Sequence, residues 1–262
     1  MVLITLNFIR YLYWRVTFRC IKQSGHIFNK QAEIHYATYG TGEPVVLLHG
    51  GLSNKLSWFS QIPMLVRSGR QVILIDTRGH VKSTLGSESL SYQLFSEDAL
   101  KVLQHLNIYK ADFIGWSDGG ITALILGQES PSYINHIIAI SANISPTGLT
   151  TQSQDPLGQK NRPLMVWINR CWTGSVNHHN ELEQSIRRIW LSPIIPKIDL
   201  RCVAAATLVI VGESDIVTVK HSKIMASLLK NGTLVVIKKG GHATPVTHAT
   251  EINAYINNFL NA

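Results

Sequence analysis

The chain has few cysteines and few charged residues for its length. Its 262 residues include 3 cysteines, and these stand far apart as Cys20, Cys171 and Cys202, with no Cys-x-x-Cys pair. A disulfide framework and a structural zinc site are therefore not expected, and a reducing compartment such as the cytoplasm is predicted. Only 15% of residues are charged whereas 45% are hydrophobic, which is enough to bury one large core.

Acidic residues are the scarcer charged kind, with 16 Asp and Glu against 24 Lys and Arg, giving a formal net charge of +8. Such an excess of positive charge can favour binding to a nucleic acid or to an anionic membrane surface, or it can simply increase solubility. The basic residues are scattered, with no run of five or more, and no nucleic-acid-binding module is recognisable. A nucleic-acid partner is therefore not expected.

The N-terminal segment, residues 1–22, lacks an uninterrupted apolar run. Arg10, Arg15 and Arg19 break it, so it does not match a membrane span of about 20 apolar residues. It also lacks the basic start and small-residue cleavage site of a secretory signal. If it is helical, Arg15, Arg19 and Lys22 share one arc, which favours peripheral contact with an anionic membrane. The alternative is an arm packed on the domain or poorly ordered.

Short apolar runs alternate with helical patterns through most of the chain. The expected strands cover residues 27–39 (with a turn at 29–30), 44–50, 71–76, 111–115, 137–140, 207–211 and 233–237. The expected helices cover residues 92–107, 118–129, 220–229 and 248–260. This alternation predicts an α/β fold with a mostly parallel, twisted sheet and helices on both of its faces.

The alternation breaks at about 143–200. Residues 145–163 have the composition of a loop, and two short helices are expected after them, at 164–172 and 181–190. A helical insertion at this point is typical of a lid over the edge of the sheet, although an ordinary pair of connecting helices fits as well. The predicted organisation is an N-terminal arm, residues 1–24, and a single domain, residues 25–262.

Ser117 stands between glycines, directly after one predicted strand and directly before one predicted helix. A strand–turn–helix of this kind is a nucleophile elbow, in which a strained turn exposes a serine and requires small neighbours. The serine would lie at the carboxyl end of a parallel strand, where open α/β sheets bind ligands. A Gly-x-Ser-x-Gly match by itself is weak, so the rest of the chain has to support it.

A nucleophilic serine needs a histidine base and a carboxylate to orient it. Asp215 and His242 follow the two last predicted strands, so both belong at the same edge of the sheet. Glu213 is the alternative acid, one step nearer its strand, and His248 is the alternative base, inside the predicted last helix.

Five short motifs follow one another along the chain, and they contain the candidate site residues: LLHGG at 47–51, DTRGHVKST at 76–84, GWSDGG at 115–120, LVIVGESD at 208–215 and KGGHATP at 239–245. In this the chain resembles the α/β-hydrolase family from about residue 27 to 262. The resemblance implies Ser117 as nucleophile, Asp215 as acid and His242 as base. It implies an oxyanion hole formed by the backbone N–H groups of Gly51 and Asp118, and no metal or organic cofactor.

The resemblance also assigns residues around the site. Leu52 replaces Gly51 as the oxyanion donor if the first turn is shifted by one residue. His49 and His80 are expected to hydrogen-bond the loop backbone near the site. Asp76 and Arg78 are expected to brace a loop. The family usually has glycine at the position of Val81, which bears on the conformation of that loop.

Within the family, GWSDGG and the short lid are most similar to the valacyclovir-hydrolase-like branch, which cleaves amino-acid esters. The carboxylate of Asp118 could pair with a substrate ammonium group, or simply favour the start of its helix. Leu52 and Trp116 are the other candidate substrate contacts, and Trp116 could instead pack the elbow. Trp167, Trp172 and Trp190 could line a pocket for an apolar group or pack the lid on the sheet.

The sequence therefore predicts a serine hydrolase that cleaves a small carboxylic ester or a related acyl substrate through an acyl-enzyme. The alternatives are a lactonase or a C–C hydrolase of the same fold, and a non-catalytic ligand-binding protein on a hydrolase scaffold. The predicted location is cytoplasmic, with membrane association through the N-terminal arm as a further expectation.

Overall fold

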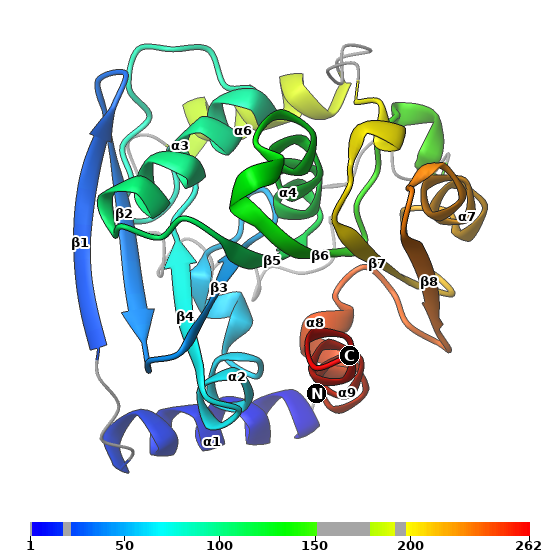
Figure 1. Ribbon diagram of the computed structural model, residues 1–262, viewed down its shortest axis with the longest axis horizontal. Coiled ribbons are helices and arrows are strands. Elements are labelled where there is room, and N and C mark those ends of the chain that lie inside the picture. The colour runs from blue at the N-terminus through cyan, green and yellow to red at the C-terminus, as the bar shows by residue number, and fades with distance from the viewer. Residues whose placement is uncertain (1, 18–21, 151–178, 192–197) are drawn as a thin grey trace.

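The computed structural model describes residues 2–17, 22–150, 179–191 and 198–262. Its centre is one sheet whose strands lie in the order β1-β2-β4-β3-β5-β6-β7-β8 (Figure 1). The pairs β1–β2 and β2–β4 are antiparallel, and all the other pairs are parallel. The strands are β1 (Lys22–Asn29), β2 (Ala32–Tyr39), β3 (Glu43–Leu48), β4 (Arg70–Ile75), β5 (Ala111–Trp116), β6 (Ile134–Ile140), β7 (Ala206–Gly212) and β8 (Gly232–Ile237). The predicted mostly parallel sheet is confirmed.

Helices cover both faces of this sheet. Figure 1 shows α3 and α4 on one face and α1, α2 and α9 on the other. The helices are α1 (Val2–Thr17), α2 (Ile62–Arg67), α3 (Tyr92–His105), α4 (Asp118–Glu129), α6 (His179–Leu191), α7 (Val219–Leu228), α8 (Thr244–Thr247) and α9 (Ala249–Leu260). The four predicted helices outside the insertion are confirmed to within a few residues. The sequence did not reveal α2, because six residues are too short to display a helical period.

The central strands are continuous apolar runs because helices cover both of their faces. Val45–Leu48 on β3 and Ala111–Gly115 on β5 are buried. Alternate side chains of each strand enter two separate apolar clusters, one under α3 and α4 and one under α1, α2 and α9. A strand with one exposed face would instead alternate apolar and polar residues.

The insertion is described in part. The predicted helix at 181–190 is present as α6. The predicted helix at 164–172, with Trp167 and Trp172, lies outside the described residues. Among the helices that the structure does describe, none combines the length and the apolar character needed to cross a membrane.

The N-terminal helix α1 packs on the sheet through aromatic side chains. Tyr11 and Trp14 are buried, and Trp14 lies 6.0 Å from Tyr39 of β2 between ring centroids. The prediction of one helical arc shared by Arg15, Arg19 and Lys22 is wrong for Lys22, because Lys22 already begins β1 whereas Arg15 lies on α1. Arg19 lies outside the described residues. Tyr11 faces the core, and Arg15 lies over its ring.

The loop after β4 adopts a left-handed turn at Val81, with φ of 50°. This is the position at which the family resemblance led us to expect glycine. The loop therefore keeps the backbone conformation that glycine favours, although the residue is β-branched. A β-branched residue at positive φ is strained, at a cost of about 1–3 kcal/mol.

We predict that Val81→Gly stabilises the protein. The substitution removes the strain, and the extra freedom that glycine brings to the unfolded chain offsets part of the gain, leaving about 1 kcal/mol. In a chain of this size that raises the unfolding temperature by about 2–4 °C, measurable by calorimetry. Lys82→Gly is the control, because Lys82 has no positive φ, and it should lower stability. An equal loss of stability in both variants would show that Val81 is not strained.

Candidate active site

Ser117 occupies a tight turn between β5 and α4. Its φ of 54° and ψ of −118° place it in a strained left-handed region, and the next residue already begins the helix. The turn brings backbones together closely: a Cβ on Gly115 would lie 2.2 Å from the carbonyl oxygen of Gly119. A Cβ on Gly119 would lie 2.1 Å from the carbonyl oxygen of Leu48 on β3. Both glycines are therefore required by the geometry of the turn.

Ser117 begins a chain of hydrogen bonds that ends at a buried carboxylate. Its Oγ lies 3.1 Å from Nε2 of His242, and Nδ1 of His242 lies 2.8 Å from Oδ1 of Asp215. Asp215 follows β7, and His242 lies between β8 and α8. The three residues meet because β5, β7 and β8 are parallel and end at the same edge of the sheet. The sequence predicts these three residues as nucleophile, base and acid, and the structure brings them together.

Asp215 is buried yet held in its ionised form. Burial by itself would raise the pKa of this carboxyl, but hydrogen bonds from His242 and Ser141 and the charge of His242 lower it further than burial raises it. Ser141 donates its hydroxyl to Oδ2 at 2.5 Å, and the Val217 N–H donates to Oδ1 at 3.1 Å. The sequence analysis did not predict a role for Ser141. The one feature of the sequence that points to it is its position directly after β6, at the same edge of the sheet.

The two alternative residues lie elsewhere. Glu213 is exposed, and its carboxylate accepts a hydrogen bond from the Lys239 N–H at 2.9 Å. His248 lies between α8 and α9, where its Nδ1 contacts the Thr247 hydroxyl at 2.9 Å. Asp215 and not Glu213 therefore bonds to His242, and His242 and not His248 reaches Ser117.

The turn after β3 lies against the elbow. A Cβ on Gly50 would be 3.2 Å from the Ser117 Cβ, and one on Gly51 would be 2.2 Å from Oδ2 of Asp118. The N–H of Asp118 is the first of α4, where helix geometry provides no internal acceptor. The N–H of Leu52 donates to Nε2 of His80 at 3.0 Å. That bond already engages the Leu52 N–H, which favours Gly51 over Leu52 as the oxyanion donor.

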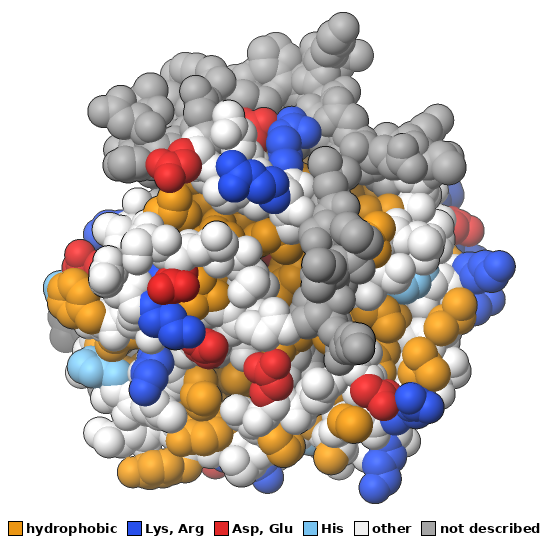
Figure 2. All heavy atoms as spheres, turned by 90° about the horizontal axis from the view of Figure 1, so that it is seen from above, with side chains coloured by type: hydrophobic (Ala, Val, Ile, Leu, Met, Phe, Trp, Pro, Cys, Tyr) orange, Lys and Arg blue, Asp and Glu red, His pale blue; other side chains and the backbone are white. Residues whose placement is uncertain are grey.

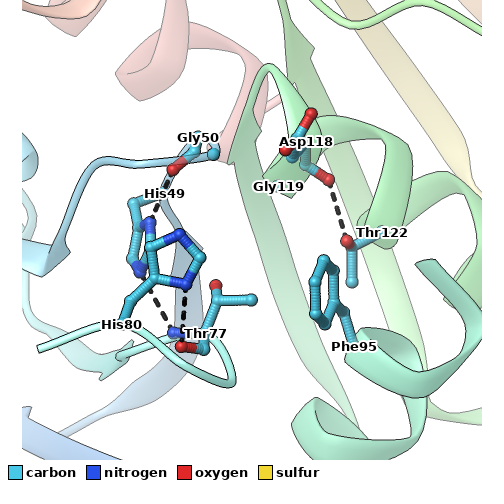
Figure 3. A pocket seen from close by; sticks show the side chains of 9 residues that line it. His49, Gly50, Thr77, His80, Phe95, Asp118, Gly119 and Thr122 are labelled. Atoms are coloured by element: carbon cyan, nitrogen blue, oxygen red, sulfur yellow. Dashed lines mark hydrogen bonds between the residues drawn. The ribbon is translucent and has the colours of Figure 1, made fainter. Parts of the chain in front are cut away.

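His49 and His80 bind loop backbone beside the elbow, as the sequence led us to expect (Figure 3). His49 contacts the Gly50 carbonyl through Nδ1 at 2.8 Å and accepts the Thr77 N–H through Nε2 at 3.0 Å. Burial lowers the pKa of His49, and it lowers the pKa of His80 to about 3, so both rings are neutral. Each ring therefore donates one hydrogen bond and accepts another, which fixes the turn that carries Gly51.

Asp76 and Arg78 brace the loop after β4 as predicted. Asp76 is buried and forms an ion pair with the partly buried Lys55, and its Oδ2 lies 3.3 Å from Nδ1 of His35. Arg78 is fully buried and forms two hydrogen bonds to Asp98 of α3, at 2.8 and 2.6 Å. The loop that holds His80 is therefore tied both to the segment after β3 and to α3.

Asp118 places its carboxylate in a buried site beside the elbow. Oδ1 accepts the Tyr92 hydroxyl at 3.0 Å, and Nε1 of Trp190 donates to both oxygens, at 2.9 and 3.0 Å. Burial raises its pKa, and the bonds from Trp190 and Tyr92 offset only part of this effect. Among the described residues, no lysine or arginine pairs with it. Trp190 lies on α6, so the helix of the insertion is joined to the residue next to Ser117.

A narrow pocket opens next to this carboxylate, between the loops after β3 and β4 and the helices α3 and α4. Figure 3 shows His49, His80 and Thr77 on one side and Asp118, Thr122 and Phe95 on the other.

Within the described part of the chain, no group of three or more His, Cys, Asp or Glu side chains is arranged to hold a metal ion.

Trp116, the residue before Ser117, supports the loop between β8 and α8 that carries His242. Its Nε1 donates to the backbone carbonyl of His242 at 2.8 Å, and the two rings lie 5.9 Å apart between centroids. The side chain is half-buried. Trp116 therefore helps to set the position of the His242 ring relative to Ser117.

Comparisons with known proteins agree with this architecture. A family model described as the alpha/beta hydrolase fold matches residues 43–166. The mouse protein "Serine hydrolase BPHL" is 24% identical over 93% of this chain and 88% of its own length. A putative non-heme chloroperoxidase of Synechocystis is 24% identical over 87% and 95%.

A similar fold is found among solved structures. The structure of an N-acyl homoserine lactone degrading enzyme superposes with a TM-score of 0.76 at 24% identity, covering 90% of this chain and all of that one. At this level of identity the likeness concerns the fold alone. The matched family model, the order of the strands and the serine in a tight turn after β5 together show that the chain has the α/β-hydrolase fold.

Proposed function

We propose that the protein is a serine hydrolase that cleaves a small carboxylic ester or a related acyl substrate through an acyl-enzyme on Ser117. The hydrogen-bond chain from Ser117 through His242 to Asp215 is the observation that carries the proposal. Serine is a weak nucleophile unless a base removes its proton, and this chain supplies a base within reach. The ionised Asp215 would hold the ring with its proton on Nδ1, which leaves Nε2 free to accept.

In the first step the Ser117 oxygen attacks the carbonyl carbon of the substrate, while its proton passes to Nε2 of His242. Negative charge develops on the carbonyl oxygen of the tetrahedral intermediate. The N–H groups of Gly51 and Asp118 are the proposed donors to that oxygen, and one such donor is worth about 3–4 kcal/mol in related chemistry. The turn fixed by His49 and His80 supports this role for Gly51.

In the second step the intermediate collapses and the bond to the leaving group breaks. His242 returns its proton to the leaving oxygen, which departs as an alcohol and leaves the acyl group on Ser117. Water then attacks the acyl-enzyme, and His242 accepts the water proton. The bond between the acyl carbon and the Ser117 oxygen then breaks, His242 returns the proton to that oxygen, and the acid product departs.

The proposal predicts the effects of substitutions along this chain. Wild type should hydrolyse p-nitrophenyl acetate, and Ser117→Ala should lower kcat by about a millionfold, because the nucleophile is lost. Asp215→Asn should lower kcat by about 10⁴-fold, because the ring loses its acceptor and takes the wrong tautomer. Release of p-nitrophenol measures both.

Glu213→Gln and His248→Gln are the matched controls, because they alter the alternative acid and base away from the site. Both should retain the wild-type rate. Full activity in Ser117→Ala would place the chemistry elsewhere. A wild type that turns over no ester, lactone, amide or C–C substrate in a panel would support the alternative of a non-catalytic binding protein.

We further propose amino-acid esters as the substrate class, with Asp118 as the group that pairs with the substrate ammonium. Its carboxylate lies next to the nucleophile and is buried, and the side chains that donate to it within the described part of the chain are the neutral Tyr92 and Trp190. Among the described residues, Oδ2 accepts one hydrogen bond, from the Trp190 N–H that it shares with Oδ1. A substrate cation would supply the missing opposite charge, which stabilises an ionised buried carboxylate.

This class is tested with methyl 2-amino-3-methylbutanoate and methyl 3-methylbutanoate, which differ only in the amino group. Wild type should prefer the amino ester in kcat/KM, at a pH below the amine's pKa of about 7.7–8.0. Asp118→Asn should reduce that preference by about tenfold or more, because a hydrogen bond between charged groups is lost. An unchanged preference, with the plain ester still hydrolysed, would remove Asp118 from substrate selection and leave the hydrolase proposal intact.

A further inference from the structure

The outward face of α1 is unusually apolar. Large hydrophobic side chains that are exposed in the described residues number ten: Leu6, Ile9, Leu12, Tyr13, Val16, Phe28, Tyr109, Ile224, Leu228 and Val236. The first five of these ten lie on this one helix. Their spacing of three or four residues along most of the series places them on a single face. We call Leu6, Ile9, Leu12, Tyr13 and Val16 the α1 apolar stripe.

The inner face of the same helix is firmly attached to the domain. Tyr11 and Trp14 are buried, and Phe8 packs edge-to-face on Phe59 with ring centroids 5.4 Å apart. The helix also contacts α8, which follows His242. Because the opposite face is anchored in this way, the stripe cannot turn inward without breaking these contacts. Val16 is 87% exposed and Tyr13 is 71% exposed.

Positive charge borders the stripe. Arg10 and Arg15 are exposed on its two sides, and no Asp or Glu occurs in the sequence before Glu33. The face uppermost in Figure 1 differs, because acidic and basic side chains lie intermixed there (Figure 2). The net charge of +8 adds a long-range attraction toward anionic surfaces.

From these observations we propose that α1 docks the protein on the surface of an anionic phospholipid membrane. The helix lies in the plane of the interface, with the α1 apolar stripe among the upper acyl chains and Arg10 and Arg15 at the phosphates. An amphipathic helix with an apolar face and flanking basic residues binds membranes in this way. At 16 residues the helix is about 24 Å long, so the contact runs along its whole length.

A second copy of the chain fits this face less well. A two-fold dimer places the same patch of both copies in contact. Here that would bring Arg10 and Arg15 of two subunits together with no acidic side chain on the helix to compensate. An anionic lipid surface instead offers both the apolar layer and the opposite charge.

Flotation of the full chain with lipid vesicles tests the proposal. The protein should float with vesicles of phosphatidylcholine containing about one-third phosphatidylglycerol, and far less with phosphatidylcholine alone. Raising the salt from about 0.05 M to about 0.5 M should weaken binding, because it screens the arginines. Arg10→Gln should weaken binding about fivefold.

The triple variant Ile9→Ser, Tyr13→Ser, Val16→Ser should weaken binding by more than about tenfold, because the stripe loses most of its apolar surface. The three side chains are exposed, so the thermal unfolding temperature should stay near that of wild type. Tyr109→Ser is the matched control, because Tyr109 is 75% exposed on another surface, and it should bind as wild type does.

Three results would overturn the proposal. The first is equal flotation of the triple variant and the wild type. The second is equal binding to neutral and anionic vesicles. The third is failure of the wild type to float with either kind of vesicle. If the wild type is then a dimer by analytical ultracentrifugation and the triple variant is a monomer, the stripe belongs to an interface with a second copy.

Discussion

The left-handed backbone at Ser117 depends on how closely β5, α4 and β3 approach one another. Gly115 and Gly119 permit contacts that a single Cβ would block, against the Gly119 carbonyl in one case and the Leu48 carbonyl in the other. The approach exposes the Ser117 hydroxyl at the edge of the sheet and leaves the first N–H of α4 unbonded within the helix. The parallel order of the strands then brings Asp215 and His242 to the same edge.

Supporting side chains around the site fix the positions of the proposed catalytic residues and of the proposed oxyanion donor Gly51. Neutral His49 and His80 set the turn at Gly51, Trp116 holds the backbone of His242, and Ser141 bonds to Asp215. Each acts between segments that are distant in sequence. Trp190 extends the same principle to the insertion, because its bond to Asp118 joins α6 to the elbow.

The sequence was sufficient where local pattern decides the structure. Continuous apolar runs indicated the central strands, an amphipathic period indicated α3, and short motifs at strand ends indicated Ser117, Asp215 and His242. It was insufficient where the partner comes from elsewhere in the chain. Nothing near Asp76 points to Lys55, and nothing near Asp118 points to Trp190. The expected arc of basic residues failed because Lys22 belongs to β1 and not to a helix.

Covalent trapping of the nucleophile tests directly whether Ser117 is activated by His242. The full chain is treated with a fluorophosphonate, which reacts with activated serines, and its peptides are examined by mass spectrometry. We expect one phosphonyl group, attached to Ser117, and no labelling of Ser117 in His242→Ala, because the base is missing. Labelling of a different serine, or an unlabelled Ser117 in the folded wild type, would contradict this expectation.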